Sequence, residues 1–154
     1  MIIPYVNLNL QWMKERKELL KIIDDTLIND QWVGGKQIED FEKNIAKVCK
    51  TKYAVGLNSG TDALTLALHL HGVKRGDEVI TAPNSFIASA AAIIHLGAKP
   101  VFVDVLPDQN IDPSLVEKVI TKKTKAIMPV HLTGRISEMK EINRIAKKYK
   151  LVVI

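Results

Sequence analysis

The sequence is poor in cysteine and in aromatic residues, and it contains no long uninterrupted hydrophobic run. Cys49 is the single cysteine among 154 residues, which excludes an intrachain disulfide and a thiolate metal site. The most apolar windows, at 64–70 and 86–96, are too short or too interrupted to span a bilayer. The first ten residues lack the charged and apolar regions of a signal peptide. We therefore expect a soluble, cytoplasmic protein with no membrane partner and no metal.

Aromatic residues make up 5% of the chain, which leaves the core to Ile, Leu, Val and Ala. The net charge is +5, and much of it comes from lysine-rich helix faces within 14–21 and 147–150. No basic stretch is interleaved with stacking aromatics, so we expect no nucleic-acid partner. The positive charge then has two possible interpretations: the basic residues form solvated helix faces, or they attract an anionic ligand.

The order of predicted elements indicates an α/β protein. Apolar spacing predicts helices over 12–29 and 38–48, with the turn-forming segment 30–35 between them. From Tyr53 onward strands alternate with helices. Strands are predicted at 53–57, 78–82, 100–104, 125–130 and from 151 to 154. Helices are predicted at 62–71 before Gly72, at 86–96 before Gly97, from Asp112 with Pro113 at its first position, and from a Ser137 cap to 149.

The predicted strands are continuous apolar runs rather than alternating ones, which is typical of a sheet covered on both faces. We therefore predict a three-layer α/β fold, with a mostly parallel sheet and helices on both of its faces. Residues 1–35 are predicted to form an arm and packing helix, and residues 36–154 the α/β domain.

The strongest local signal is Ser59-Gly60-Thr61, where a predicted strand passes directly into a helix. Free N–H groups at a helix start, together with the hydroxyls of Ser59 and Thr61, can bind a phosphate. Gly60 lets the backbone approach the anion closely. Ser59 or Thr61 could instead only cap the helix. The segment is neither a dinucleotide fingerprint nor a P-loop, because no lysine follows the glycine.

Two more candidates follow predicted strands, at the edge of an open α/β sheet where ligands collect. Phe86 could lay its ring on a planar cofactor, or pack beneath its own helix as part of the core. His131 could contact a cofactor or substrate, or it could be a structural histidine that is hydrogen-bonded within its loop.

Read in order, the motifs resemble the DegT/StrS group of sugar aminotransferases, which are pyridoxal-phosphate (PLP) enzymes of fold type I. They are WVGGKQIEDFE, AVGLNSGTDAL, GDEVITAPNSFIA, GAKPVFVDV and IMPVHLTG. The resemblance implies that Gly60 and Thr61, with Ser59 adjacent, bind the PLP phosphate and that Phe86 stacks over the pyridine ring. Trp32 begins a segment that matches one near the active site. It could equally belong to a turn between helices with a buried tryptophan.

The resemblance also implies an activity for the parent enzyme. It would transfer an amino group from an amino acid, with glutamate expected, to a nucleotide-linked keto-sugar in deoxyamino-sugar and polysaccharide biosynthesis. Relatives are typically homodimers. The chain ends at Ile154 inside an apolar run, before the family's PLP-binding lysine, so we expect an inactive fragment with no catalytic residue of its own. The alternatives are a sugar dehydratase of the same family and a non-catalytic phosphate- or nucleotide-binding domain.

Overall fold

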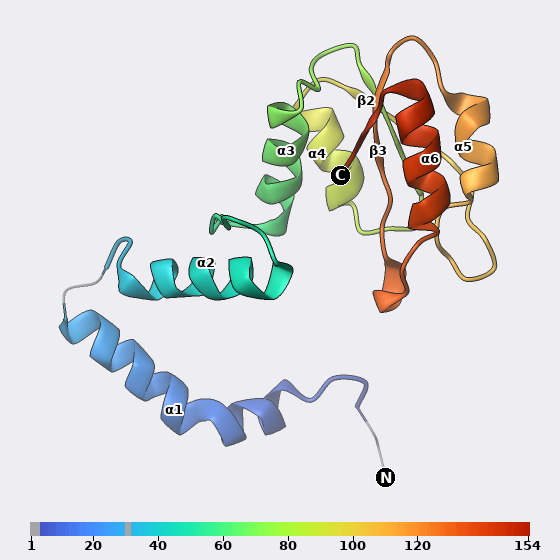
Figure 1. Cartoon of the computed structure of the whole chain (residues 1–154). Helices are drawn as coiled ribbons and strands as arrows, with labels where there is room; N and C mark the ends of the chain where they lie inside the picture. Colours follow the sequence, from blue (N-terminus) through green and yellow to red (C-terminus); the bar gives the residue numbers. More distant parts are fainter. Residues whose placement is uncertain (1–3, 30–31) are drawn as a thin grey trace. The chain divides into compact units, whose positions relative to one another are not determined.

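The computed structural model describes residues 4–29 and 32–154, and the chain divides after Gly56 into two compact units. The first unit contains the helices α1 (Leu8–Ile28) and α2 (Lys36–Cys49). The second contains four strands, four α-helices and a 3-10 turn (Figure 1). Its order is α3 (Gly60–Leu70), β1 (Glu78–Thr81), α4 (Ala88–His95), β2 (Lys99–Phe102), α5 (Pro113–Val119), β3 (Thr124–Met128), η1 (Leu132–Gly134), α6 (Met139–Tyr149) and β4 (Val152–Val153).

The first unit confirms both predicted helices. Helix α1 begins at Leu8 rather than at residue 12, because the Asn7 side chain accepts a hydrogen bond from the Leu10 N–H at 3.0 Å and caps it. Residues 30 and 31 of the predicted turn lie outside the described residues. Gly34 and Gly35 both have a positive φ, which ends the turn and starts α2.

The predicted strand at 53–57 is wrong, since these residues form no helix or strand and pair with no strand among the described residues. Apolar content alone cannot make a strand, which needs a hydrogen-bonded neighbour. The segment instead runs across the boundary between the two units, and the side chains of Tyr53 and Val55 are exposed. The predicted division of the chain after residue 35 stays a prediction.

The second unit is the predicted three-layer α/β fold. Its strands lie in the order β2-β1-β3-β4, and every neighbouring pair is parallel. Along β1 and β3 successive side chains point to opposite faces. Ile80 and Ile127 pack with Val116 of α5 and Ile142 of α6 in one buried cluster. On the other face Val79, Ala126 and Met128 pack with Leu68 of α3 and with Ala92 and Ile93 of α4 in a second cluster.

Local signals set most helix boundaries of this unit. Gly72 and Gly97 have a positive φ after α3 and α4, and the Asp112 carboxylate caps α5 by accepting the Ser114 N–H at 2.8 Å. The predicted Ser137 cap is wrong, because α6 begins after Glu138 and no side chain caps it. The Ser137 hydroxyl donates instead to the Val130 carbonyl at 3.2 Å, within the loop that precedes α6.

None of the helices formed by the described residues combines the length and the apolar character that a bilayer crossing needs. The described residues also contain no group of three or more His, Cys, Asp or Glu side chains placed to hold a metal ion.

Candidate functional site

The carboxyl ends of β1 and β3 mark a switch point of the fold. The chain leaves β1 toward α4 on one face of the sheet, and it leaves β3 toward α6 on the opposite face. The last paired residues of the two strands are Thr81 and Met128, and the Thr81 hydroxyl donates to the Met128 carbonyl at 2.8 Å. Such divergence opens a crevice outside the strand ends, where open α/β sheets bind their ligands.

Three candidate segments lie at this edge of the second unit. Figure 1 shows the start of α3, the loop into α4 and the loop after β3 along the same lower side of the sheet. Ser59–Thr61 begin α3, Phe86 lies between β1 and α4, and His131 lies between β3 and η1. The fold therefore brings these candidates from three separate stretches of sequence to one side of the sheet.

Among the described residues, two backbone N–H groups at the start of α3 have no hydrogen-bond acceptor. Ser59 is the cap: its Oγ accepts the Asp62 N–H at 3.1 Å and donates to the Asp62 carboxylate at 2.9 Å. No described residue accepts a hydrogen bond from the N–H of Gly60 or of Thr61. A Cβ built on Gly60 would meet no atom within 4 Å, so the space beside these donors is open. The helix start is thus both capped and able to bind an anion.

Phe86 does not belong to the core. Its side chain is 77% exposed, so the interpretation that it packs beneath its helix is wrong. The predicted helix at 86–96 begins only at Ala88, because the Phe86 carbonyl accepts the Ser89 N–H and residues 83–87 form a turn. An exposed aromatic ring beside the strand ends is free to stack on a planar ligand.

His131 is hydrogen-bonded within its loop, as the structural interpretation expected. Its Nδ1 accepts the Ser137 N–H at 3.3 Å, so in the neutral imidazole the proton lies on Nε2. No described residue bonds to that Nε2. The ring is exposed, and a loop bond through Nδ1 leaves the other nitrogen free for a ligand.

The sequence reading missed two asparagines at the same edge. Asn110, which is 1% exposed, bonds to the Leu132 N–H and to the Arg135 carbonyl from the loop after β2. Asn84 donates to the Gln109 carbonyl at 2.9 Å. The one available signal was the placement of Asn84 and Asn110 in loops that follow predicted strands. That signal does not reveal burial or partners.

Trp32 lies in the first unit, at the turn before α2. Its side chain is 69% exposed, so the alternative of a turn with a buried tryptophan is wrong. Its contact with an active site stays a prediction.

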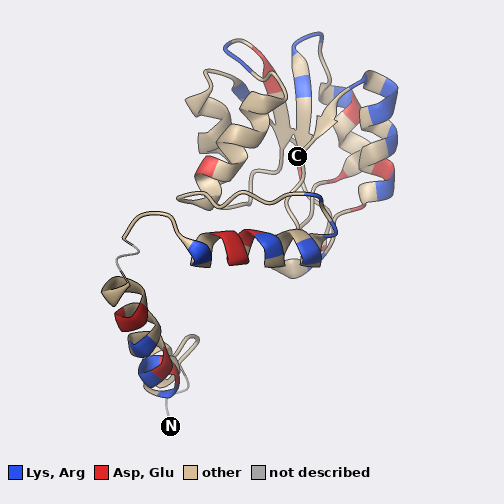
Figure 2. Ribbon diagram, turned by 60° about the vertical axis from the view of Figure 1, so that its left-hand side comes forward, with Lys and Arg blue, Asp and Glu red and all other residues tan. Residues whose placement is uncertain are grey.

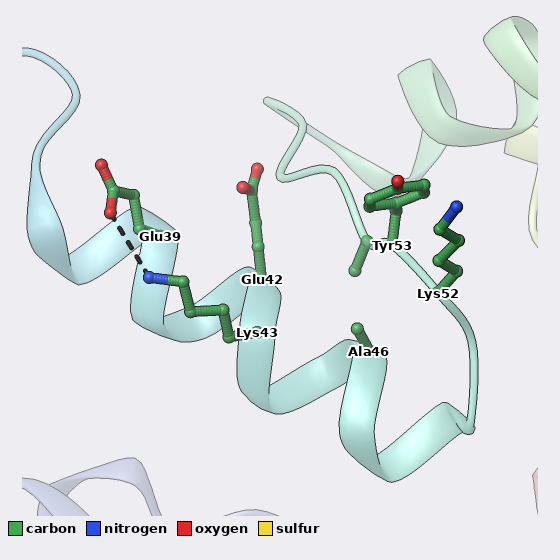
Figure 3. Close-up of a pocket in the computed structure, with 7 residues that line it drawn as sticks. Glu39, Glu42, Lys43, Ala46, Lys52 and Tyr53 are labelled. Carbon is green, nitrogen blue, oxygen red and sulfur yellow. Dashed lines mark hydrogen bonds and ion pairs between the residues drawn. The ribbon is translucent and has the colours of Figure 1, made fainter.

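The first unit also contains a hollow of about 260 Å³ between α2 and residues 52–54. Figure 3 shows Glu42 directed at the segment that follows α2, and its carboxylate accepts the Gly56 N–H at 2.7 Å. The lining carries both charge signs, with Lys43 paired to Glu39 at 3.5 Å. None of the predicted site residues lines this hollow, and Lys43 and Glu39 of its lining are already paired with each other.

The basic residues of the second unit do not gather at the carboxyl ends of the strands, where the candidate residues lie. Figure 2 shows Lys and Arg in loops at the upper side of this unit and along its helices. Lys74 and Arg75 precede β1, and Lys122 and Lys123 precede β3, which places them at the amino ends of the strands. Backbone donors, rather than a basic cluster, therefore characterise the phosphate candidate.

Known proteins match this chain over nearly its whole length. One relative, the dTDP-3-amino-3,6-dideoxy-alpha-D-galactopyranose transaminase of Aneurinibacillus thermoaerophilus, is 43% identical over 99% of this chain and 42% of its own length. The crystal structure of Streptomyces venezuelae DesV in complex with a ketimine intermediate has a TM-score of 0.92 and 39% identity, over 98% of this chain and 41% of that one.

A second similar structure, NtdA of Bacillus subtilis with bound cofactor PMP, has a TM-score of 0.88 and 38% identity over 91% of this chain and 32% of that one. The chain thus spans about two fifths of the length of the transaminase above. The sequence profile of the DegT/DnrJ/EryC1/StrS aminotransferase family matches residues 13–154. Fold, motif order and this match agree, and the chain belongs to the DegT/DnrJ/EryC1/StrS aminotransferase family.

Proposed function

We propose that this chain binds PLP as part of an enzyme that transfers an amino group to a nucleotide-linked keto-sugar. The amino donor is an amino acid, with glutamate expected, and the enzyme is a cytoplasmic homodimer. Membership of the family, the names of similar proteins and the chemistry of the sheet edge all support this activity. In this proposal residues 36–154 form the cofactor domain and residues 1–35 an arm, with Trp32 near the site.

The observation that carries the proposal is the pair of uncommitted N–H groups at Gly60 and Thr61. A phosphate dianion suits them, because free backbone donors at a helix start lie at the positive end of the helix dipole and point toward the anion. The open space beside Gly60 gives the anion room. The Thr61 hydroxyl, which has no acceptor or donor among the described residues, adds a third donor.

Ser59 has a different part in this proposal from its two neighbours. Its hydroxyl hydrogen is already given to the Asp62 carboxylate, at 2.9 Å. Ser59 therefore holds the helix start in place, while Gly60 and Thr61 bind the phosphate. Both the cap and the phosphate interpretations of this segment then apply, each to different residues.

The remaining candidates orient the rest of the cofactor. Phe86 presents an exposed ring at the strand ends and would cover one face of the pyridine. His131 would donate from Nε2 to the cofactor or the substrate. When bound, PLP supplies the electron sink for the amino transfer, and the residues of this chain anchor and orient it.

Titration of the purified protein with PLP, followed by visible absorbance and by competition with inorganic phosphate, tests the proposal. Gly60→Pro removes one N–H without breaking α3, because proline is favoured at the first helical position and Ser59 is already extended. We expect a loss of PLP affinity of about tenfold or more, since a hydrogen bond to a charged group contributes about 1.5–3 kcal/mol.

Thr61→Ala and Thr65→Ala form a matched pair. Both remove a threonine hydroxyl from α3, but the Thr65 hydroxyl is one turn farther on and bonds to the Thr61 carbonyl at 2.9 Å. We expect Thr61→Ala to weaken PLP binding and Thr65→Ala to leave it unchanged. Equal effects of the two substitutions would contradict the assignment. Binding of phosphate with no preference for PLP would favour the non-catalytic alternative.

Incubation of the full-length protein with PLP, glutamate and a nucleotide-linked keto-sugar tests the reaction. Formation of 2-oxoglutarate together with an amino sugar is the expected result. Loss of water from the sugar without consumption of glutamate would identify the dehydratase alternative.

A further inference from the structure

One buried side chain joins the loop after β2 to the loop after β3. Asn110 Oδ1 accepts the Leu132 N–H at 3.2 Å, and its Nδ2 donates to the Arg135 carbonyl at 3.3 Å. The Leu132 N–H can only donate and the Arg135 carbonyl can only accept, so these partners fix the orientation of the amide. The side chain is 1% exposed, so bulk water does not compete for either bond.

Asn110 is itself held firmly. Its carbonyl accepts the Leu106 N–H at 2.9 Å, and its own N–H donates to an Asp108 carboxylate oxygen at 3.1 Å. The second Asp108 oxygen lies 3.3 Å from Nδ2 and takes its other hydrogen. The turn 106–110 is therefore held together by its own hydrogen bonds, and every polar atom of the Asn110 side chain has a partner.

The two bonds from Asn110 bracket a residue in an unfavourable backbone conformation. Thr133 has a φ of 55°, in the left-handed region that β-branched residues rarely adopt. Leu132 precedes it and Arg135 follows two residues later. Such a conformation persists only where the surroundings enforce it, and it is found most often at functional sites. Asn110 supplies that constraint on both sides of Thr133.

The same turn also reaches the segment that carries Phe86. Asn84, two residues before Phe86, donates from Nδ2 to the Gln109 carbonyl at 2.9 Å. Asn84 is exposed, so water competes for this bond, whereas Asn110 is buried and its bonds have no such competitor. Asn110 is therefore the stronger of the two connections.

We propose that Asn110 is a positioning residue, which fixes His131 beside the β1–β3 switch point by holding residues 132–135. It contacts no ligand and acts through the loop that continues from His131. The catalytic meaning of this inference rests on the proposed function, because His131 needs a cofactor or substrate to meet.

Amide hydrogen exchange measured by NMR provides the structural arm of the test. Asn110→Asp keeps the size and the acceptor but turns a carboxylate oxygen toward the Arg135 carbonyl. Asn143→Asp makes the same chemical change on the exposed surface of α6 and is the control. We expect Leu132 exchange to rise about tenfold in Asn110→Asp, and to stay within about twofold in the control.

Exchange at Ile80 and Ile127, in the centre of the sheet, separates a local effect from general destabilisation. If Asn110→Asp does not fold, Asn110→Ser removes the amide without adding charge and takes its place. The imidazole resonances of His131 should shift in the Asn110 variants. Unchanged Leu132 exchange and unchanged His131 resonances, or a rise at Ile80 and Ile127 as large as that at Leu132, would overturn the inference.

The functional arm uses the full-length protein. We expect kcat for amino transfer to fall about tenfold in Asn110→Ser, with KM for the amino donor within about twofold, because a misplaced group costs rate. If Leu132 exchange rises or the His131 resonances shift while kcat stays unchanged, the positioning role would also be overturned. If the wild-type protein does not transaminate at all, the proposed function fails. The exchange and imidazole measurements still decide whether Asn110 positions His131.

Discussion

The two units of this chain differ in what holds their helices. In the second unit, α3 and α4 pack on one face of the sheet and α5 and α6 on the other, around residues that are almost fully buried. In the described part of the first unit, Ala46 is the one buried residue, and α1 buries none. Several large apolar side chains of α1 and α2 are exposed, among them Met13, Ile23, Phe41 and Val48.

The comparison teaches which features follow from local sequence and which need a sheet. Periodic apolar residues specify α1 and α2 as helices, with an Asn7 cap at the start of α1, although each helix gains little from burial within its own unit. The candidate site depends on the parallel strands, whose carboxyl ends bring distant loops together. The predicted site positions come from three stretches of sequence, which would have no common location without β1 and β3: Ser59–Thr61, Phe86 and His131.

The largest expected difference between the units concerns stability. Ile127→Ala removes a fully buried side chain from the central strand β3 and should lower the free energy of unfolding by about 2–5 kcal/mol. Ile38→Ala makes the same change on α2, where the side chain is 46% exposed, and should cost less than about 1 kcal/mol. Urea denaturation measures both. Equal losses would mean that α2 buries its apolar face as deeply as β3 does.

A second comparison separates binding from folding within the second unit. Phe86→Ala should weaken PLP binding about threefold to tenfold, because an aromatic stacking contact contributes about 0.5–1.5 kcal/mol. The substitution should leave the unfolding midpoint nearly unchanged, since the ring is exposed. Ile87→Ala, at the neighbouring position, where the side chain is 69% exposed, is the control and should change neither quantity. A large loss of stability in Phe86→Ala would mean that the ring packs in the core, which would contradict its assignment as a stacking residue.

Helix caps allow the same substitution test in both units. Ser59→Ala and Asn7→Ala each remove a side-chain acceptor from a helix start, which costs about 1 kcal/mol. We expect the Ser59 variant to lower the stability of the cooperative sheet unit. The Asn7 variant should only reduce the helical circular-dichroism signal of α1. A cooperative loss in the Asn7 variant would show that the two units unfold together.

The smallest expected effect is one that both units share. A hydrogen bond from Lys36 lowers the pKa of the Asp40 carboxyl, and one from Arg144 lowers the pKa of the Glu141 carboxyl. Because each pKa is lower in the folded chain, each pair stabilises its helix at pH values above the ordinary pKa of a carboxyl group. That contribution disappears as the pH falls through the lowered pKa. Carboxyl NMR titration should find both below the usual range, and a normal value for either would contradict the pairing.

Much of the fold could be predicted from the sequence, because local signals carry it. Asp112 and Pro113 mark the start of α5, and continuous apolar runs identify β1 and β3. Residues 53–57 show the limit of that method, since an apolar run becomes a strand only when a neighbour pairs with it. The motif order identified the family, but no single motif did.

The candidate site was only partly predictable. The motifs pointed to Gly60, Thr61 and Phe86 as candidates. The role of Ser137 depends on the conformation of its own loop, and that of Asn110 depends on a loop that is distant in sequence. Serine is a common helix cap, but Ser137 bonds instead to Val130 and His131 in the loop before α6. Asn110 looks like any loop asparagine until the fold buries it between two loops. Long-range partners of polar side chains leave no periodic signal in a sequence.

The central claim is that the start of α3 holds the phosphate of PLP. Titration of the 15N-labelled protein with PLP, followed by amide NMR, tests it most directly. We predict the largest saturable shifts at the N–H groups of Gly60 and Thr61, and the same two amides should respond to inorganic phosphate. Saturable shifts confined to the lysine-rich loops before β1 and β3, with Gly60 and Thr61 unmoved, would contradict the account.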